Sequence, residues 1–430
     1  MPDHVGVAEA VEITGLAGDG RGVGRLATGE VVFVAGGLPG DHAELEQAGR
    51  RRGVLEARLA RLVRPSPDRI PARCPQLRCG GCPLRSLSAP AQGAHKRRRL
   101  VDVMRRLGGV DVEALLPPVT TFGDGWGLRH RARLHAAFID GRWALGYHAA
   151  GSHQVVPLSQ CPVVWPEVEA IALSLQAQLA GCPRQAALSQ VEICYSRRDG
   201  RGAARILTNG PVALTRPYVG GMVGGALSAC DLVGSDGRYV CGNIELRYDH
   251  AGASAFDIKY EPGLFTQACV IGNDELIAAV AQLALVGPSP RVLECYAGVG
   301  NFTAHLARQG AQLVAYEHQA RAAMLCRRNN QAAGLNVEVV AEDAAAALAE
   351  PDAFDVVLLD PPRTGAAALM PSLGRRRQKR VVYVSCDPAT LARDTRVLTT
   401  MGWQLGGLWG WDMFPQTPHL EAVAFFERGG

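Results

Sequence analysis

The sequence predicts an α/β protein in which a Rossmann-like domain with a mostly parallel sheet follows a small β-barrel and a central α+β domain. The 430 residues exceed the ~100–200 residues of one ordinary domain. Before residue 65, short β-type runs alternate with glycine-rich turns. From residue 264 onward, apolar strands alternate with helical stretches, which indicates a parallel sheet covered by helices on both faces. We therefore place the barrel in 1–65, the central domain in 66–262 and the Rossmann-like domain in 263–430.

The barrel is predicted from β-type runs at 5–16, 31–34 and 54–62. The turns between them, GDGRGVGR and LPGD, are rich in glycine, which adopts the positive φ angles that tight corners need. A small barrel of this kind suits RNA binding. The next stretch, RPSPDRIP (64–71), predicts a linker because proline fits neither a strand nor a helix interior.

Composition places the chain among globular proteins. Hydrophobic residues make up 47% and charged residues 20%, and no apolar run approaches the ~20 residues of a membrane-spanning helix. The N-terminus, MPDHVGVAEAVEITG, lacks the features of a secretory signal. We therefore expect a soluble cytoplasmic protein without membrane contact or disulfides. Its twelve cysteines are then core thiols, metal ligands or catalytic groups.

Positive charge is concentrated near the start of the chain. Residues 1–106 contain 18 Lys and Arg but 11 Asp and Glu, whereas the net charge of the whole chain is +4. Basic runs at 50–52 and 96–99 indicate a phosphate-facing surface. A solvated helix face is the alternative interpretation.

A glycine loop follows the first predicted strand of the parallel sheet, in RVLECYAGVGNFT (291–303). A strand, a glycine loop and a helix start allow a nucleotide-type ligand to approach backbone amides. The next strand ends at Glu317, where a carboxylate can bind a ribose diol. A dinucleotide is the alternative ligand, but the loop lacks the full G-x-G-x-x-G spacing.

The two following strands also end in acids, namely Glu342, Asp343 and Asp360. The carboxyl ends of parallel strands lie at one edge of the sheet, where open α/β folds bind ligands. An acidic edge attracts a cationic ligand. S-adenosylmethionine carries a sulfonium and an amino group, so the sequence favours it over the anionic pyrophosphate of NAD.

Cys386 lies between a buried-type strand and a helix start, in VVYVSCDPATLARD (381–394). A helix N-terminus lowers the pKa of a thiol, which predicts a thiolate nucleophile. An inert core cysteine is the alternative. The predicted position at the cofactor edge and the polar neighbours favour the nucleophile.

A thiolate at this edge suits methylation of a uridine at C5. Addition of the thiolate to C6 makes C5 nucleophilic enough to take a methyl group from a sulfonium, and a general base must then remove the C5 proton. Glu421, at the start of the last apolar strand, is the first candidate for this base. His419 is the second, and an ordinary surface glutamate is the alternative interpretation of Glu421.

These motifs together resemble the bacterial RNA 5-methyluridine methyltransferase family, and specifically its members with a TRAM domain and an iron–sulfur cluster. The nucleophile motif of that family is matched by SCDPATLARD (385–394), with Asp387 in place of the usual asparagine. Its second motif is matched by DMFP (412–415) and HLE (419–421), which implies that Glu421 accepts the proton. The resemblance implies six S-adenosylmethionine positions: Gln267, Tyr296, Asn301, Glu317, Asp343 and Asp360. Of these, Gln267 and Asp360 can equally contact the target base.

Four cysteines resemble the ligands of a [4Fe–4S] cluster in that family: Cys74, Cys79, Cys82 and Cys161. The spacing between the first two is one residue shorter than in the family. Zinc is the competing metal because C-x2-C pairs also bind zinc. Methyl transfer moves no net electrons, so we expect the cluster to organise the fold or the RNA surface.

The resemblance also implies an RNA partner. TRAM domains are OB-like modules that grip RNA by charge and stacking, and the target uridine must flip out of its stack. We expect 23S rRNA to be the substrate, because TRAM members with a cluster commonly modify large-subunit rRNA. We also expect the protein to be a monomer. The alternatives are a tRNA substrate, cytosine-5 methylation, a substrate other than nucleic acid, and an RNA-binding protein with an inactive methyltransferase domain. Cytosine enzymes of the RNA type generally use a second cysteine near their Asp-Pro motif, and none lies near Asp360 in the sequence.

Overall fold

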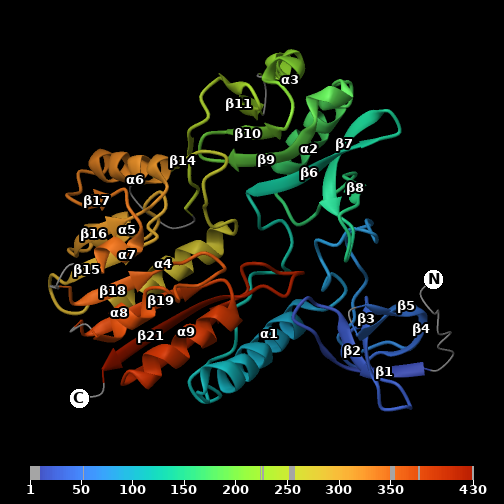
Figure 1. Cartoon of the computed structure of the whole chain (residues 1–430), viewed down its shortest axis with the longest axis horizontal. Coiled ribbons are helices and arrows are strands. Elements are labelled where there is room, and N and C mark those ends of the chain that lie inside the picture. Colours follow the sequence, from blue (N-terminus) through green and yellow to red (C-terminus); the bar gives the residue numbers. More distant parts are fainter. Residues whose placement is uncertain are drawn as a thin grey trace.

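The computed structural model shows a barrel, a central sheet and a C-terminal sheet with its helices (Figure 1). It describes residues 10–51, 53–222, 224, 227–250, 257–348, 354–375 and 378–428. Residues 5–9 of the first predicted strand and Arg52 of the basic run 50–52 lie outside the described residues.

The N-terminal segment forms a closed five-stranded barrel with strand order β1-β2-β3-β5-β4. Its strands are β1 (Ala10–Leu16), β2 (Gly22–Arg25), β3 (Val31–Ala35), β4 (His42–Arg51) and β5 (Val54–Arg64). The expected barrel is therefore present, although β4 was not predicted as a strand and β2 was interpreted as part of a turn. Glycine in β2 serves close packing, because a Cβ on Gly22 would lie 2.8 Å from the carbonyl oxygen of Gly37.

A buried carboxylate ties the barrel to the proline-rich stretch that follows it. Asp41 is fully buried and accepts hydrogen bonds from the backbone amides of Leu38 and Ser66. The guanidinium of Arg69 forms an ion pair with the same carboxylate. These contacts lower the pKa of Asp41, although burial alone would raise it. The stretch 64–71 is thus anchored to the barrel.

The central part is built on a seven-stranded sheet with the order β12-β11-β10-β9-β6-β7-β8, antiparallel except between β10 and β11. Its strands and helices are β6 (Arg131–Ile139), β7 (Arg142–His148), β8 (Val155–Pro157), α2 (Pro166–Leu179), η2 (Arg184–Ala186), β9 (Leu188–Ser196), β10 (Arg201–Thr208), α3 (Val212–Val219), η3 (Gly220–Met222), β11 (Leu227–Gly234) and β12 (Gly237–Cys241). A two-stranded sheet, β13 (Leu246–Arg247) with β14 (Lys259–Tyr260), follows.

The C-terminal part is a second seven-stranded sheet, with the order β17-β16-β15-β18-β19-β21-β20. Its elements are α4 (Val270–Ala284), β15 (Arg291–Cys295), α5 (Thr303–Arg308), β16 (Gln312–Tyr316), α6 (Ala320–Ala332), β17 (Glu338–Val340), α7 (Ala344–Ala347), β18 (Val356–Leu359), α8 (Met370–Arg375), β19 (Arg380–Ser385), α9 (Pro388–Thr400), β20 (Trp403–Trp411) and β21 (Glu421–Arg428). Strands β15 to β19 are parallel. β21 lies between β19 and β20 and is antiparallel to both. The first residue of β21 therefore lies at the edge where the parallel strands end.

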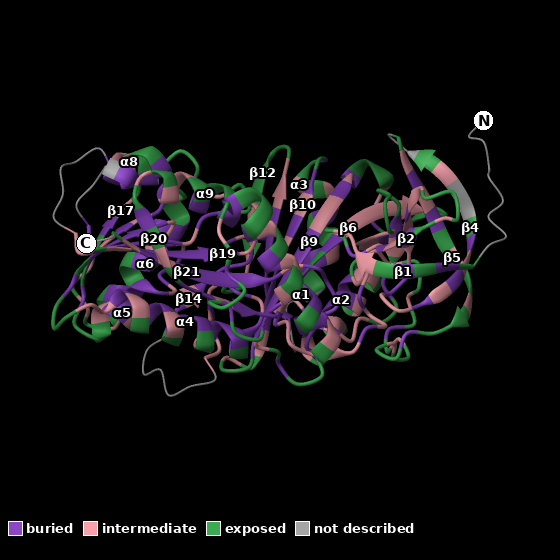
Figure 2. Cartoon of the chain, turned by 90° about the horizontal axis from the view of Figure 1, so that it is seen from below, coloured by how far each residue is buried: buried purple, intermediate pink, exposed green. Residues whose placement is uncertain are grey.

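The helix α1 (Ala89–Val103) crosses from the barrel to the C-terminal sheet (Figure 1). It continues into a π-helical turn (Met104–Gly108), and both contact α9. Leu100 and Met104 are buried in the same hydrophobic cluster as Leu391 and Trp403. The inward faces of these helices and the C-terminal strands are buried, whereas the outward faces are exposed (Figure 2). Although the sequence places α1 in the central segment 66–262, it completes the core of the C-terminal sheet.

Every helix in the described part of the chain is too short or too polar to cross a membrane.

Candidate active site

The glycine loop after β15 is fixed to the tip of β16 by a carboxylate. The backbone amide of Gly298 donates to Glu317 at 2.9 Å, and that of Gln319 donates to the other oxygen of Glu317 at 2.7 Å. Tyr296 and Gly298 adopt φ angles of 66° and 58°. This left-handed backbone turns the chain sharply at the end of the strand. Tyr296 and Glu317 thus lie where the sequence places the cofactor.

The remaining predicted cofactor residues of the Rossmann-like part lie at the ends of its other elements. The side-chain amides of Asn301 and Asn273 bond reciprocally at 2.9 Å, which ties the loop to α4. Asp343 is the exposed N-cap of α7 and accepts a bond from the amide of Ala345 at 2.8 Å. Asp360 directly follows β18. The parallel strands thus bring Glu317, Asp343 and Asp360 to one edge of the sheet.

A buried glutamate lies in β15 immediately before this loop. Glu294 is 1% exposed. Burial, together with the charges of Asp360 and Glu317, raises its pKa to about 8, while the hydroxyl of Thr303 opposes this shift. The carboxyl of Glu294 is therefore protonated in the folded protein at neutral pH.

Glu294 should make the stability of the fold depend on pH. Its pKa is higher in the folded state than its ordinary value of 4.5. The protonated carboxyl therefore adds to the free energy of unfolding at low pH, and this contribution is lost as the pH rises from about 4.5 through about 8. We expect Glu294→Gln, which stays neutral, to show a smaller fall in unfolding free energy between these pH values. Urea unfolding at pH 5 and pH 8.5 measures this, with Glu338→Gln, exposed on β17, as the control. An equal fall in Glu294→Gln and the native protein would contradict the assignment.

Cys386 and Glu421 are brought together by the antiparallel pairing of β19 with β21. Ser385 pairs with Ala422, so Cys386, which follows Ser385, lies beside Glu421, which precedes Ala422. Glu421 is 1% exposed, and its Oε2 atom has no hydrogen-bonding partner among the described residues. Asp360, at the end of the adjacent β18, acts electrostatically on both Cys386 and Glu421. One thiol and two carboxyls therefore converge at the sheet edge.

The pKa of Cys386 differs from the prediction. The cysteine does precede α9, whose N-cap Asp387 accepts bonds from the amides of Ala389 and Thr390 at 2.9 and 3.0 Å. Burial and the charges of Glu421 and Asp360 nevertheless raise the thiol pKa to about 12. Burial and then the charges of Glu421 and Asp360 outweigh the helix N-terminus in this structure, so the thiol pKa is raised where the sequence predicts that it is lowered.

The two carboxyls are also shifted. Burial raises the pKa of Asp360 to about 7, and burial together with the charge of Asp360 raises the pKa of Glu421 well above its ordinary value. Two neighbouring carboxyls that interact in this way disfavour simultaneous ionisation. The site can consequently hold and exchange a proton near neutral pH.

An arginine that sequence reasoning missed also faces this group. Arg363 follows the Asp-Pro-Pro turn after β18, and its charge lowers the pKa of Cys386. Its Nη2 atom lies 3.4 Å from Nε2 of His419. Burial and nearby cations lower the pKa of His419 to about 4, so this residue is neutral. The arginine that follows Asp-Pro-Pro in DPPR (360–363) was the sign in the sequence from which this residue could have been found.

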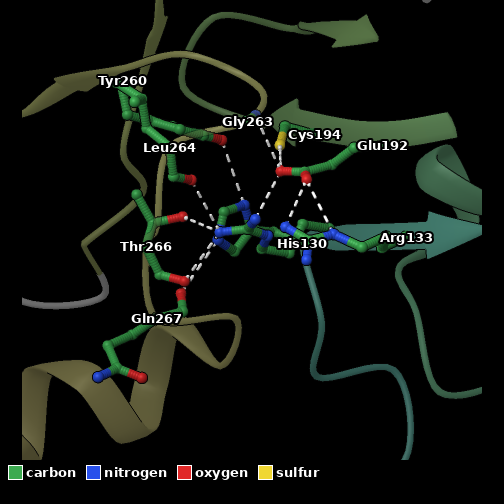
Figure 3. A network of polar contacts seen from close by, with 10 residues as sticks. His130, Arg133, Glu192, Cys194, Tyr260, Gly263, Leu264, Thr266 and Gln267 are labelled. Carbon is green, nitrogen blue, oxygen red and sulfur yellow. Dashed lines mark hydrogen bonds and ion pairs between the residues drawn. The ribbon is translucent and has the colours of Figure 1, made fainter. Parts of the chain in front are cut away.

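Gln267 lies on the segment before α4, which the central sheet anchors (Figure 3). Arg131 of β6 donates to the backbone oxygens of Leu264 and Thr266 at 3.2 and 3.1 Å, and it forms an ion pair with Glu192 of β9. His130 contacts the backbone oxygen of Gln267 at 3.1 Å. The Gln267 side chain points away from this network in Figure 3, and its buried Oε1 atom has no partner among the described residues.

The four cysteines predicted as metal ligands line one cavity of about 210 Å³. Burial raises the pKa of Cys82 to about 12, and it also raises the pKa of Cys161. Arg85 holds the cysteine loop by donating to the backbone oxygens of Gln76, Cys79 and Cys82. Among the described residues, no three His, Cys, Asp or Glu side chains are placed to hold a single metal ion.

Comparisons with known proteins agree on one activity. A family model described as tRNA (Uracil-5-)-methyltransferase matches residues 253–429. Three similar proteins are named 23S rRNA (uracil(1939)-C(5))-methyltransferase RlmD. That of Alkalilimnicola ehrlichii is 33% identical over 97% of this chain and 96% of its own. That of Methylococcus capsulatus is 33% identical over 97% of each chain, and that of Pseudomonas putida is 34% identical over 99% and 95%.

A solved structure shares its fold with nearly the whole chain. The Pyrococcus abyssi tRNA (uracil-54, C5)-methyltransferase in complex with S-adenosyl-L-homocysteine matches with a TM-score of 0.74 and 24% identity, covering 97% of this chain and all of the other. The RlmD relatives are more than 30% identical to this chain over nearly the full length of both sequences. The chain therefore belongs to the RNA uracil-C5 methyltransferase family.

Proposed function

We propose that this protein transfers the methyl group of S-adenosylmethionine to C5 of a uridine in RNA, with 23S rRNA as the substrate. The observation that carries the proposal is the convergence of Cys386, Glu421 and Asp360 at the carboxyl edge of the sheet. A core cysteine would have apolar neighbours. Cys386 instead lies beside the carboxyls of Asp360 and Glu421 and is partly exposed.

Cys386 performs the first step. Its thiol loses a proton as the substrate binds, and its sulfur adds to C6 of the uracil ring, so that C5 gains the electron pair that attacks the methyl group. S-adenosylmethionine supplies that methyl group. Asp360, whose pKa is raised to about 7 beside Cys386, is suited to take the thiol proton and pass it to solvent, so that the carboxyl pair is again able to accept a proton at the closing step.

Glu421 performs the closing step. C5 now carries both the methyl group and its original proton, and Glu421 removes that proton. The electron pair forms the C5–C6 double bond and expels the sulfur of Cys386. The Oε2 atom of Glu421 suits this role because it has no hydrogen-bonding partner among the described residues.

The acidic sheet edge suits the cofactor. Glu317 lies at the tip of β16, where a ribose is expected, and Tyr296 and Asn301 belong to the adjoining loop. The buried Oε1 atom of Gln267 has no partner among the described residues, so it is available to a ligand or to the target base. Asp343 and Asp360 add negative charge that favours a sulfonium ligand.

The activity is tested by methylating RNA from a strain that lacks this protein. The purified protein, labelled S-adenosylmethionine and either 23S rRNA or tRNA are combined, and the product nucleoside is identified by mass spectrometry. We expect 5-methyluridine at one position in 23S rRNA. Label in tRNA only would move the substrate to the alternative class, 5-methylcytidine would contradict the assigned base, and no label would favour an inactive domain that only binds RNA.

The cysteine cavity suits a [4Fe–4S] cluster as a structural group, held by Cys74, Cys79, Cys82 and Cys161. All four side chains line the same cavity, together with the basic side chains of Arg85, Arg129, Arg131 and Arg133. Arg131 and Arg133 form ion pairs with Glu192, so Arg85 and Arg129 are the cations that favour the negative charge of four thiolates. A bound cluster would tie the loop 74–82 to Cys161, which lies between β8 and α2.

We expect purification without oxygen to yield about four iron and four sulfide atoms per chain. Cys82→Ser should lose most of both, because one of the four thiolates is removed. Metal and sulfide analysis with the visible spectrum measures this, and Cys241→Ser on β12 is the control. Zinc without iron in the native protein would instead support the zinc alternative.

We further propose that the barrel is a TRAM domain that binds the RNA beside the site. Its support is the five-stranded closed barrel and the excess of positive charge in residues 1–106. The basic face of α1 next to the barrel includes the exposed Arg98. The protein is still predicted to be a monomer.

A further inference from the structure

The segment 412–420, which we name the β20–β21 loop, connects β20 to the catalytic Glu421 without helix or strand structure of its own. Nevertheless most of it is buried, including Asp412, Gln416 and Thr417. Gln416 also has a φ angle of 69°. A loop with this backbone conformation needs specific contacts to hold one shape.

The first set of contacts comes from α1. Gln92, Lys96 and Arg99 are spaced by four and three residues, so they lie on one face of the helix. Gln92 exchanges two hydrogen bonds with Gln416, at 2.9 and 2.7 Å. Arg99 donates to the backbone oxygen of Pro418 at 2.7 Å. These side chains hold the middle and the end of the loop.

Lys96 holds the beginning of the loop through a buried ion pair. Its side chain is 0% exposed, and it contacts Asp412, whose side chain is 2% exposed. The Lys96 ammonium also donates to the backbone oxygen of Phe414 at 3.2 Å. Burying two charges is costly, and well-packed apolar residues often replace such a pair without loss of stability. A role in fixing the loop accounts for the pair better than a role in stability.

Other contacts hold the beginning and the middle of the loop. The amide of Asp412 donates to the backbone oxygen of Thr120 at 2.8 Å. The amide of Leu84, two residues after Cys82, donates to the oxygen of Gln416 at 3.0 Å. The loop is thus held between α1, the cysteine loop and the segment before the central sheet.

We propose that Lys96 is a positioning residue for the proton acceptor: its ion pair with Asp412 fixes the β20–β21 loop so that Glu421 reaches the C5 proton of the methylated uridine. This proposal rests on the proposed function. Lys96 does not touch the reacting atoms. It acts at the first turn of the loop, and Gln92 and Arg99 hold the rest.

The proposal is tested by separating adduct formation from adduct breakdown. Protein, S-adenosylmethionine with a labelled methyl group and 23S rRNA are mixed and quenched at intervals. The labelled protein–RNA complex is then separated under denaturing conditions. If only Glu421 is displaced, Lys96→Met forms the methylated adduct at a rate close to that of the native protein. The adduct should decay about 10- to 100-fold more slowly, since small misplacements of a catalytic group cost rate factors of this size.

Three variants complete the test. Lys96→Arg, which keeps the charge, should recover most of the decay rate. Arg106→Met removes an exposed cation from the π-helical turn after α1 and should decay like the native protein. Lys96→Met combined with Asp412→Leu removes both buried charges, so it should fold even if the single variant does not, and it should still decay slowly.

Two results would overturn the proposal. One is a folded Lys96 variant whose adduct decays at the native rate. The other is a variant in which formation and decay slow equally, because that pattern indicates a general structural defect. Failure of the proposed function looks different, since the native protein would then form no methylated adduct with RNA.

Discussion

Cys386→Ala should reduce methyl transfer by at least about 10⁴-fold, the scale of loss when an enzyme's nucleophile is removed. Without the sulfur, C5 of the uracil ring has no source of electron density. The variant should still bind S-adenosylmethionine, because the glycine loop and Glu317 belong to other elements. Transfer of labelled methyl groups to RNA measures the loss, and equilibrium binding measures cofactor affinity.

RNA containing 5-fluorouridine gives a second measurement for Cys386. In 5-fluorouridine, C5 carries fluorine in place of hydrogen, so there is no proton for a base to remove after methyl transfer. The native protein should therefore remain covalently attached to the RNA. Cys386→Ala should form no such complex. Cys241→Ala, on the edge strand β12 of the central sheet, should form it normally. A full yield of complex from Cys386→Ala would disprove the assignment of the nucleophile.

Glu421→Gln should have the second-largest effect, a loss of about 10²- to 10⁴-fold in turnover, which is typical of a missing general base. Because addition and methyl transfer precede the base's step, a methylated covalent complex should accumulate even with ordinary uridine. Denaturing gel electrophoresis with labelled cofactor detects this complex.

The control for Glu421 lies on the same strand. Glu427, near the far end of β21, forms an ion pair with Arg380. Glu427→Gln should turn over normally and accumulate no complex. If Glu421→Gln shows neither accumulation nor loss of turnover, another group removes the proton.

The site was predictable where a residue is attached to the end of a strand. Apolar runs fix β15, β16, β18 and β19, so Glu317, Asp360 and Cys386 necessarily lie at one edge. The same reasoning placed Glu421 at this edge from the direction of the last strand. The barrel was equally visible in its repeated turns.

Features that depend on packing between distant segments were not predictable. The pKa of Cys386 depends on two carboxyls that only the folded sheet brings near it. Lys96 was part of a basic run that indicated an exposed surface, yet it is buried against Asp412, 316 residues later. A lysine in a basic run carries no signal of such a partner. The same is true of α1, whose packing on α9 crosses the predicted domain boundary.

The position of β21 links folding to chemistry during synthesis. A nascent chain that ends before residue 421 lacks the strand between β19 and β20, so the sheet is left with an unfilled interior position. The same strand begins with Glu421, so the segment that fills the sheet also carries the proposed proton acceptor.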